Sequence, residues 1–175
     1  MLILLDDIDA FIFNGFAYKD KKMKSVTKGD ITLGNSRSAE QEKEKKKYSE
    51  LLDLIKDRLH DDVKDVRFSG RLVDSPCCLV SDEGDIDPQT EKLLRAMGQD
   101  IPAAKRILEI NASHRIFQLM NTIFLEDKNS RILKDYIDLI YNQALILEGS
   151  KPKDPLAFTK IIARLMVECA QKNSG

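Results

Sequence analysis

The chain has 175 residues with 28 basic and 29 acidic side chains, which leaves a formal net charge of -1. This length predicts one domain, or one domain and a piece of another. The balanced charge argues against a nucleic-acid partner, which normally needs a basic face. No apolar run approaches the roughly 20 residues that span a bilayer, so we expect no membrane partner. Its three cysteines follow no disulfide framework, and no signal peptide is recognisable, so the expected location is a reducing cytoplasm.

The first 34 residues indicate a strand, a short helix and a second strand. Residues 1–5 form a continuous apolar run, which is typical of a strand buried on both faces of a sheet. Residues 24–33 are expected to form the second strand, interrupted by Gly29 and Asp30. A buried strand needs neighbours that the following residues do not obviously supply. We therefore expect the chain to begin inside a domain whose larger part lies upstream.

Residues 35–47 contain no large apolar side chain and predict a charged linker that runs into the solvated start of a helix. A nucleic-acid-binding segment is the alternative, but glutamates dilute the lysines of this run, which favours a solvated helix face. The helix is expected to end near His60. Its core-facing residues are predicted to be Tyr48, Leu51, Leu52, Ile55 and Leu59.

Three short strands are expected next, at residues 66–72, 77–80 and 106–110. In the first of them apolar residues alternate with polar ones, which predicts a half-buried strand of the kind found in antiparallel sheets. Together with the helices on either side, these strands predict the α+β class with a small antiparallel three-stranded sheet.

A short helix is predicted between the second and third strands. Asp87 is expected to cap it, Pro88 occupies its first turn, and Gly98 ends it. Its few apolar residues are open to two interpretations, because they either cover the sheet or form a flexible exposed surface that binds varied apolar partners. These residues are Leu93, Leu94 and Met97.

A longer helix should follow the third strand, with Asn111 or Ser113 as its cap. Residues 127–130 then make a polar break before the next helix. The residues predicted to face inward from the longer helix are Ile116, Leu119, Met120 and Ile123.

Residues 131–148 form the most regular stretch of the chain. Their apolar residues lie on two neighbouring helical stripes, so the apolar surface is wider than one helix contact requires. Gly149 is expected to end this helix, and Asp154 with Pro155 to begin a second one, which makes an antiparallel helical hairpin.

The wide apolar surface of this hairpin has two interpretations. Either all of it belongs to the core of the chain, or one face pairs with a second copy and closes a four-helix bundle by twofold symmetry. The residues assigned to such a dimer interface are Ile132, Tyr136, Ile137, Ile140, Tyr141, Ala144, Phe158, Ile161, Ile162, Leu165, Met166 and Cys169.

No catalytic, cofactor-binding or metal-binding site is predicted for this chain. The acidic turn at residues 81–88 lacks the spacing of a calcium loop, and Cys77 and Cys78 alternate across a strand without a neighbouring CxxC motif. Neither His60 nor His114 accompanies a nucleophile motif, and no glycine-rich phosphate loop occurs. We therefore predict that the chain itself is not an enzyme.

Residues 69–85 resemble a signature of the heat-shock protein 90 chaperones, specifically of the bacterial HtpG type. The resemblance continues through residues 93–94 and 107–114, and residues 4–9 and 25–26 resemble the end of that family's middle domain. It implies that residues 1–34 end the middle domain, that 35–47 are a charged linker and helix start, and that 48–175 form the C-terminal dimerisation domain. The residues that carry the signature are Arg71, Leu72, Asp74, Ser75, Pro76, Leu79 and Val80.

This resemblance implies part of an ATP-dependent chaperone that acts as a homodimer on unfolded or partly folded client proteins. ATP and magnesium are then expected in other domains of the parent protein, with no cofactor in this chain. Leu93, Leu94 and Met97 become candidates for client contact. The last residues lack the acidic peptide by which eukaryotic members recruit helical-repeat co-chaperones. The alternative is a free-standing dimeric structural or adaptor protein without a chaperone cycle.

Overall fold

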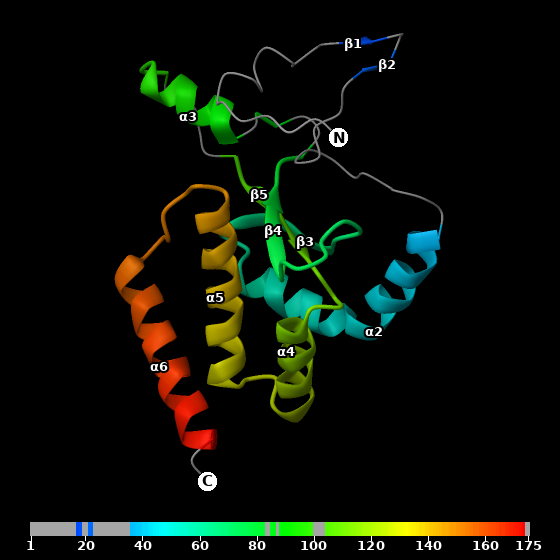
Figure 1. The fold of residues 1–175 in the computed structure, drawn as a ribbon, viewed down its shortest axis with the longest axis vertical. Coiled ribbons are helices and arrows are strands. Elements are labelled where there is room, and N and C mark those ends of the chain that lie inside the picture. Colours follow the sequence, from blue (N-terminus) through cyan, green and yellow to red (C-terminus); the bar gives the residue numbers. More distant parts are fainter. Residues whose placement is uncertain are drawn as a thin grey trace. The chain divides into compact units, whose positions relative to one another are not determined.

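The computed structural model describes residues 17–18, 21–22, 36–82, 85–86, 88–99 and 104–173. The chain divides into two compact units, a smaller one within residues 1–30 and 80–105 and a larger one within residues 31–79 and 106–175. Helices and strands both occur, which confirms the α+β class (Figure 1). None of the described helices is long and apolar enough to cross a membrane.

The smaller unit contains strands β1 (Ala17–Tyr18) and β2 (Lys21–Lys22), which pair antiparallel, and helix α3 (Pro88–Ala96). Helix α3 ends as predicted, because Gly98 adopts a positive φ of 82° and its N–H donates to the carbonyl of Arg95 at 3.0 Å. The predicted cap Asp87 and the strands expected at residues 1–5 and 24–33 lie outside the described residues.

The larger unit is built on a three-stranded sheet of order β3-β5-β4, formed by Val63–Phe68, Arg106–Ile110 and Cys77–Val80. The predicted antiparallel sheet is wrong, because β3 pairs with β5 in parallel, with Phe68 opposite Ile110. On the other side of β5, the N–H of Asn111 donates to the carbonyl of Pro76 at 2.9 Å. The end of β5 thus meets the start of β4, which makes the sheet mixed.

The strand expected at residues 66–72 begins earlier, at Val63, and ends at Phe68. Val66 and Phe68 are buried as predicted, whereas Gly70 and Leu72 belong to the loop that follows. The central strand β5 is buried at all five positions, including Arg106 and Glu109. The alternation of apolar and polar residues in β3 predicted an antiparallel sheet, but a half-buried edge strand with a parallel neighbour shows the same alternation. The sequence of β3 alone does not indicate the direction of its partner β5, which lies far away along the chain.

Helix α2 (Ser36–Arg58) packs against β3 and against α4 (Arg115–Glu126). It begins at Ser36, within the segment predicted as a linker, and its predicted apolar face is confirmed by the burial of Tyr48, Leu51, Ile55 and Leu59. The ring of Tyr48 meets the rings of two other core residues edge-on, at centroid distances of 6.1 and 5.2 Å. These residues are Phe68 and Phe117.

Helix α4 differs from its prediction at the cap and in the buried face. Its cap is His114, whose Nδ1 accepts from the N–H of Ile116 at 3.2 Å, rather than Asn111 or Ser113. The side chains that α4 buries fully are Phe117, Met120 and Phe124. Leu119 is exposed, and the helix is therefore rotated relative to the predicted orientation so that its aromatic residues reach the core.

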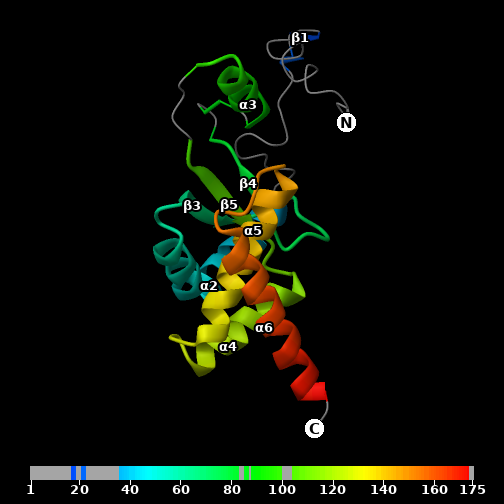
Figure 2. The ribbon, with the colours of Figure 1, turned by 90° about the vertical axis from the view of Figure 1, so that its left-hand side faces the viewer.

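Helices α5 (Arg131–Leu147) and α6 (Pro155–Asn173) form the predicted hairpin and lie side by side (Figures 1 and 2). Gly149 ends α5 with a φ of 81°, and the N–H of Ser150 donates to the carbonyl of Leu145 at 2.8 Å. A carboxylate oxygen of Asp154 accepts from the N–H of Ala157 at 2.9 Å, which confirms the cap predicted for α6.

Candidate functional site

Helix α5 turns part of the predicted dimer surface toward the core of its own chain. Ile137, Ile140, Tyr141 and Ala144 are buried there, among residues of α2, α4 and the sheet. These four side chains therefore lie as in the first interpretation of the hairpin, in which its apolar surface belongs to the core of the chain. A surface for a second copy must therefore be sought elsewhere on the hairpin.

One face of α6 is occupied by α5. Ile161 and Leu165 are buried, and the guanidinium of Arg164 donates to both carboxylate oxygens of Asp135 at 2.7 and 2.6 Å. Such a two-point bond fixes the register of the two helices as well as joining them.

The opposite face of α6 is mostly apolar, and no residue in the described part of the chain covers it. Met166 is 67% exposed and Val167 is 56% exposed, while Leu156, Ala163 and Ala170 are exposed on the same side. An amphipathic surface helix normally carries polar residues on this side. Among the predicted interface residues, Met166 is exposed here, and Phe158 and Ile162 are half-buried at its border. Cys169 is exposed as well, but it lies one turn after Leu165, on the other side of the helix.

Sequence reasoning missed four members of this uncovered face. Leu156, Ala163, Val167 and Ala170 were not assigned to an interface, because only the apolar residues spaced three and four apart from Phe158 onward were followed. At 100° per residue these four positions fall on one side of the helix, opposite Ile161 and Leu165. A helical projection of α6 could therefore have found them.

A groove of about 300 Å³ lies between α4, α5 and α6, near the C-terminal end of α6. Its walls are mostly apolar, and all of its charged lining residues, Glu126, Asp127 and Glu168, are acidic. Four of the predicted interface residues line it, namely Ile132, Tyr136, Leu165 and Cys169. Burial against the groove raises the pKa of Tyr136, and the neighbouring Cys169 and Glu168 add to this shift.

Helix α3 presents the predicted client-contact residues in the smaller unit. Leu93 is 51% exposed and Met97 is 69% exposed, whereas Leu94 is half-buried. An ion pair of 2.9 Å between Glu91 and Arg95 supports the helix on another side.

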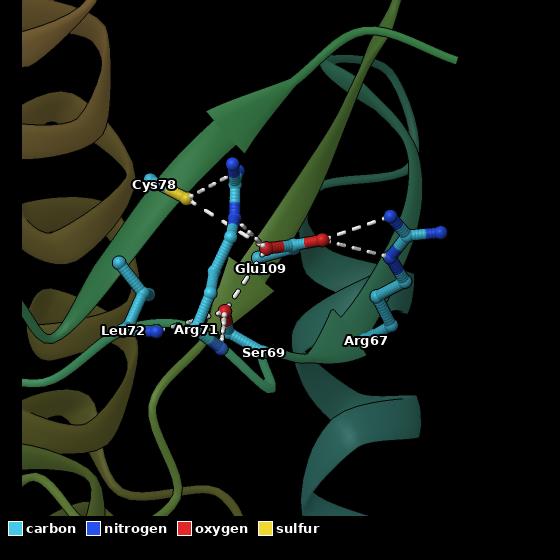
Figure 3. Close-up of polar contacts among 6 residues, drawn as sticks. All are labelled: Arg67, Ser69, Arg71, Leu72, Cys78 and Glu109. Atoms are coloured by element: carbon cyan, nitrogen blue, oxygen red, sulfur yellow. Dashed lines mark hydrogen bonds and ion pairs between the residues drawn. The ribbon is translucent and has the colours of Figure 1, made fainter. Parts of the chain in front are cut away.

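A buried carboxylate, Glu109, organises one end of the sheet (Figure 3). Arg67 and Arg71 approach it from opposite sides, with Arg67 Nη2 at 2.8 Å from Oε1 and Arg71 Nε at 3.0 Å from Oε2. The hydroxyl of Ser69 also donates to Oε2 at 3.0 Å, and it accepts from the N–H groups of Arg71 and Leu72. These partners of the carboxylate are structural, and they hold the loop after β3 against β5.

The cysteines near this network are poor nucleophiles. The Cys77 thiol is buried, which raises its pKa to about 12, and it donates to the carbonyl of Ile140 at 3.1 Å. Burial also raises the pKa of Cys78, and the nearby guanidinium of Arg71 opposes this shift. Thiolates are the reactive form of cysteine, so neither residue is suited to catalysis. Within the described residues, no group of three His, Cys, Asp or Glu side chains is placed to hold a metal ion.

The sequence was compared with known protein families and curated proteins. A family model described as Hsp90 protein matches residues 1–174. The chain is 43% identical to the chaperone protein HtpG of Geobacter sulfurreducens, over all of this chain and 28% of that protein. It is 40% identical to the chaperone protein HtpG of Bacillus subtilis, over 95% of this chain and 27% of that protein. The chain thus spans little more than a quarter of the length of these relatives.

Proposed function

Because the chain belongs to the Hsp90 protein family, we propose that it serves as the dimerisation and client-contact module of an ATP-dependent chaperone. ATP and its magnesium ion are assigned to other domains of the longer parent protein, outside the part that corresponds to this chain. Catalysis is assigned there too. Holding two copies together gives such a module a mechanical role, since it raises the effective concentration of the other domains for one another.

The observation that carries the dimer is the pair of apolar faces on α6. One face covers α5 through Ile161 and Leu165, and the other exposes Met166 and Val167 to water. Removing apolar surface from water is favourable by roughly 25 cal/mol per Å². A second copy of the hairpin offers the same face, so twofold pairing covers both at once.

The test is the solution mass of the chain, measured by light scattering over a dilution series. We expect twice 19.9 kDa for the unchanged chain. The double variant Met166→Asp/Val167→Asp should have the mass of one chain, because it places unpaired carboxylates in an apolar contact. Leu125→Asp is the matched control, since Leu125 is an apolar residue of α4 that is 73% exposed.

Substitution of Ile140 by a charged residue is not a suitable test of the dimer. Ile140 lies in the core of its own chain, so a charge there unfolds the chain whether or not a dimer exists. A monomeric mass for the unchanged chain at every concentration contradicts the proposed dimer. The proposed interface is also contradicted if Leu125→Asp dissociates the dimer as strongly as the double variant Met166→Asp/Val167→Asp does.

Client contact is proposed for the exposed side of α3. Flexible Met and Leu side chains suit weak binding of varied apolar sequences. We expect Leu93→Gln/Met97→Gln to weaken binding of a chemically unfolded model protein, measured by fluorescence anisotropy. Leu125→Gln again serves as the control. Undiminished binding by the folded double variant rules out this surface.

The alternative of a free-standing adaptor is not favoured, because the curated relatives are named as chaperones. A cytoplasmic location remains a prediction. Cys77, Cys78 and Cys169 are free thiols in the structure.

A further inference from the structure

We propose that the groove between α4, α5 and α6 binds a basic amphipathic helix of another protein. The apolar side of that helix lies in the groove, and its lysine or arginine side chains lie against Glu126 and Glu168. This surface differs from the uncovered face of α6 and from the exposed side of α3, so the proposal rests neither on the dimer nor on client contact. The shape, the lining, the charge and the position of the groove carry it.

The shape of the groove suits a helix. Three helices build it, with α5 between the other two (Figures 1 and 2). Along α4 its lining extends from Leu119 to Glu126, which is about 10 Å, or two helical turns, at 1.5 Å per residue. The backbone groups of these walls are mostly bonded within their own helices, so they offer an extended strand few partners. A helix satisfies its own backbone and needs none.

The lining of the groove has room for about two large apolar side chains, because an apolar cavity of about 150 Å³ accommodates a benzene ring. The volume of the groove is about 300 Å³. Ile123, Ile132 and Tyr136 form apolar parts of its surface, and Leu119 is 44% exposed beside them. Two apolar side chains one turn apart on a bound helix, at positions i and i+4, fit this space.

The charge of the groove favours a basic occupant. Glu126 and Asp127 lie at the C-terminal end of α4, and Glu168 lies on α6 at the other wall. In the part of the chain that the structure describes, none of these three carboxylates forms an ion pair. The last turn of α4 has no basic residue, so the negative end of its helix dipole adds to the potential of the groove. A helix with basic residues on both borders of its apolar stripe complements the two walls.

The position of the groove keeps it open when the uncovered face of α6 is covered. Leu165 and Glu168 line the groove, whereas Ala163 and Val167 lie on the opposite side of the same helix. A second copy placed on Val167 and its neighbours therefore leaves room for another protein in the groove.

A designed peptide of about 14 residues, or four helical turns, is the probe. It carries leucines at i and i+4 spacing and lysines on both borders of that stripe. The control peptide has glutamate in place of every lysine. Fluorescence anisotropy of the labelled peptides measures binding to the full chain. We expect the glutamate peptide to bind roughly tenfold more weakly than the lysine peptide, because its charges repel those of the groove.

Variants of the chain locate the binding. Glu126→Lys and Glu168→Lys should each weaken binding of the lysine peptide roughly tenfold, because each opposes like charges. Asp57→Lys makes the same change of net charge at an exposed residue of α2 outside the groove, and it should leave binding unchanged. Thr122→Trp fills the groove from an exposed position of α4, so it should abolish binding while circular dichroism shows a folded chain.

Cys169 reports on the groove directly, because its exposed thiol belongs to the lining. Saturating lysine peptide should slow the alkylation of Cys169 by iodoacetamide several-fold. The half-buried Cys78 lies outside the groove and should react at an unchanged rate. Peptide mass spectrometry separates the two sites.

Three results overturn the proposal. The first is a lysine peptide that does not bind. The second is equal binding to the unchanged chain, Glu168→Lys and Thr122→Trp, which shows an attraction that does not involve the groove. The third is protection of Cys169 that grows with the concentration of the chain and that the lysine peptide does not produce in dilute chain, because a second copy then fills the groove.

Discussion

Arg164 of α6 donates to both carboxylate oxygens of Asp135 on α5, at 2.7 and 2.6 Å, beside the buried residues Ile161 and Leu165. The carboxylate of Asp135 is itself buried, whereas the guanidinium of Arg164 keeps partial contact with water. This pair therefore sets how the outer helix of the hairpin is oriented, and with it which face of α6 is left uncovered.

Removing one side of this pair should destabilise the hairpin. Arg164→Ala leaves a buried carboxylate without its two donors, and we expect the free energy of unfolding to fall by about 2–3 kcal/mol. Urea denaturation followed by circular dichroism measures the change. The matched control is Lys56→Ala, which breaks a more exposed ion pair with Asp65 and should leave stability nearly unchanged.

Glu109 should matter more to stability than either of its arginines. Glu109→Gln leaves two arginines and a serine hydroxyl without their shared anion, for an expected loss of about 3 kcal/mol. Arg67→Ala should cost less, because Arg71 and Ser69 still satisfy the carboxylate. Chemical denaturation of the two variants gives the order. A larger loss for Arg67→Ala contradicts the central role of Glu109.

The three thiols should react with iodoacetamide at very different rates. Cys169 is exposed, Cys78 is half-buried, and Cys77 is buried with a pKa of about 12. At neutral pH and low protein concentration, Cys169 should be alkylated first and Cys77 only when the chain unfolds. Peptide mass spectrometry with and without urea distinguishes the sites. Rapid alkylation of Cys77 in the folded chain contradicts its placement in the core.

The raised pKa of Tyr141 predicts that the free energy of unfolding falls at alkaline pH. Burial raises the pKa of its phenol from 10.0 to about 12, so the unfolded chain releases this proton at lower pH than the folded chain does. The stabilisation is complete below pH 10 and is lost as the pH rises toward 12. Comparing the pH dependence of thermal unfolding with that of Tyr141→Phe isolates this contribution. Identical curves for the two proteins contradict it.

The sequence by itself was sufficient for the local features of the fold. The caps at Asp154 and Gly149, the second and third strands, and the buried face of α2 are as predicted. These features depend on hydrogen bonds between near neighbours and on the spacing of apolar residues along one element, both of which can be read from a short stretch of chain.

Only the tertiary structure decided which elements are neighbours. Three features join residues that are far apart in the sequence: the parallel pairing of β3 with β5, the rotation of α4 that turns its own Phe117 into the core, and the assembly of Arg67 and Arg71 around Glu109. The same holds for the hairpin. Its periodicity predicted a wide apolar surface, but not which part of that surface packs in the chain's own core and which part stays exposed. Packing buries Ile137 and Ile140 in the chain's own core and leaves Met166 exposed, because each apolar stripe is equally able to cover any apolar surface that the rest of the chain brings to it.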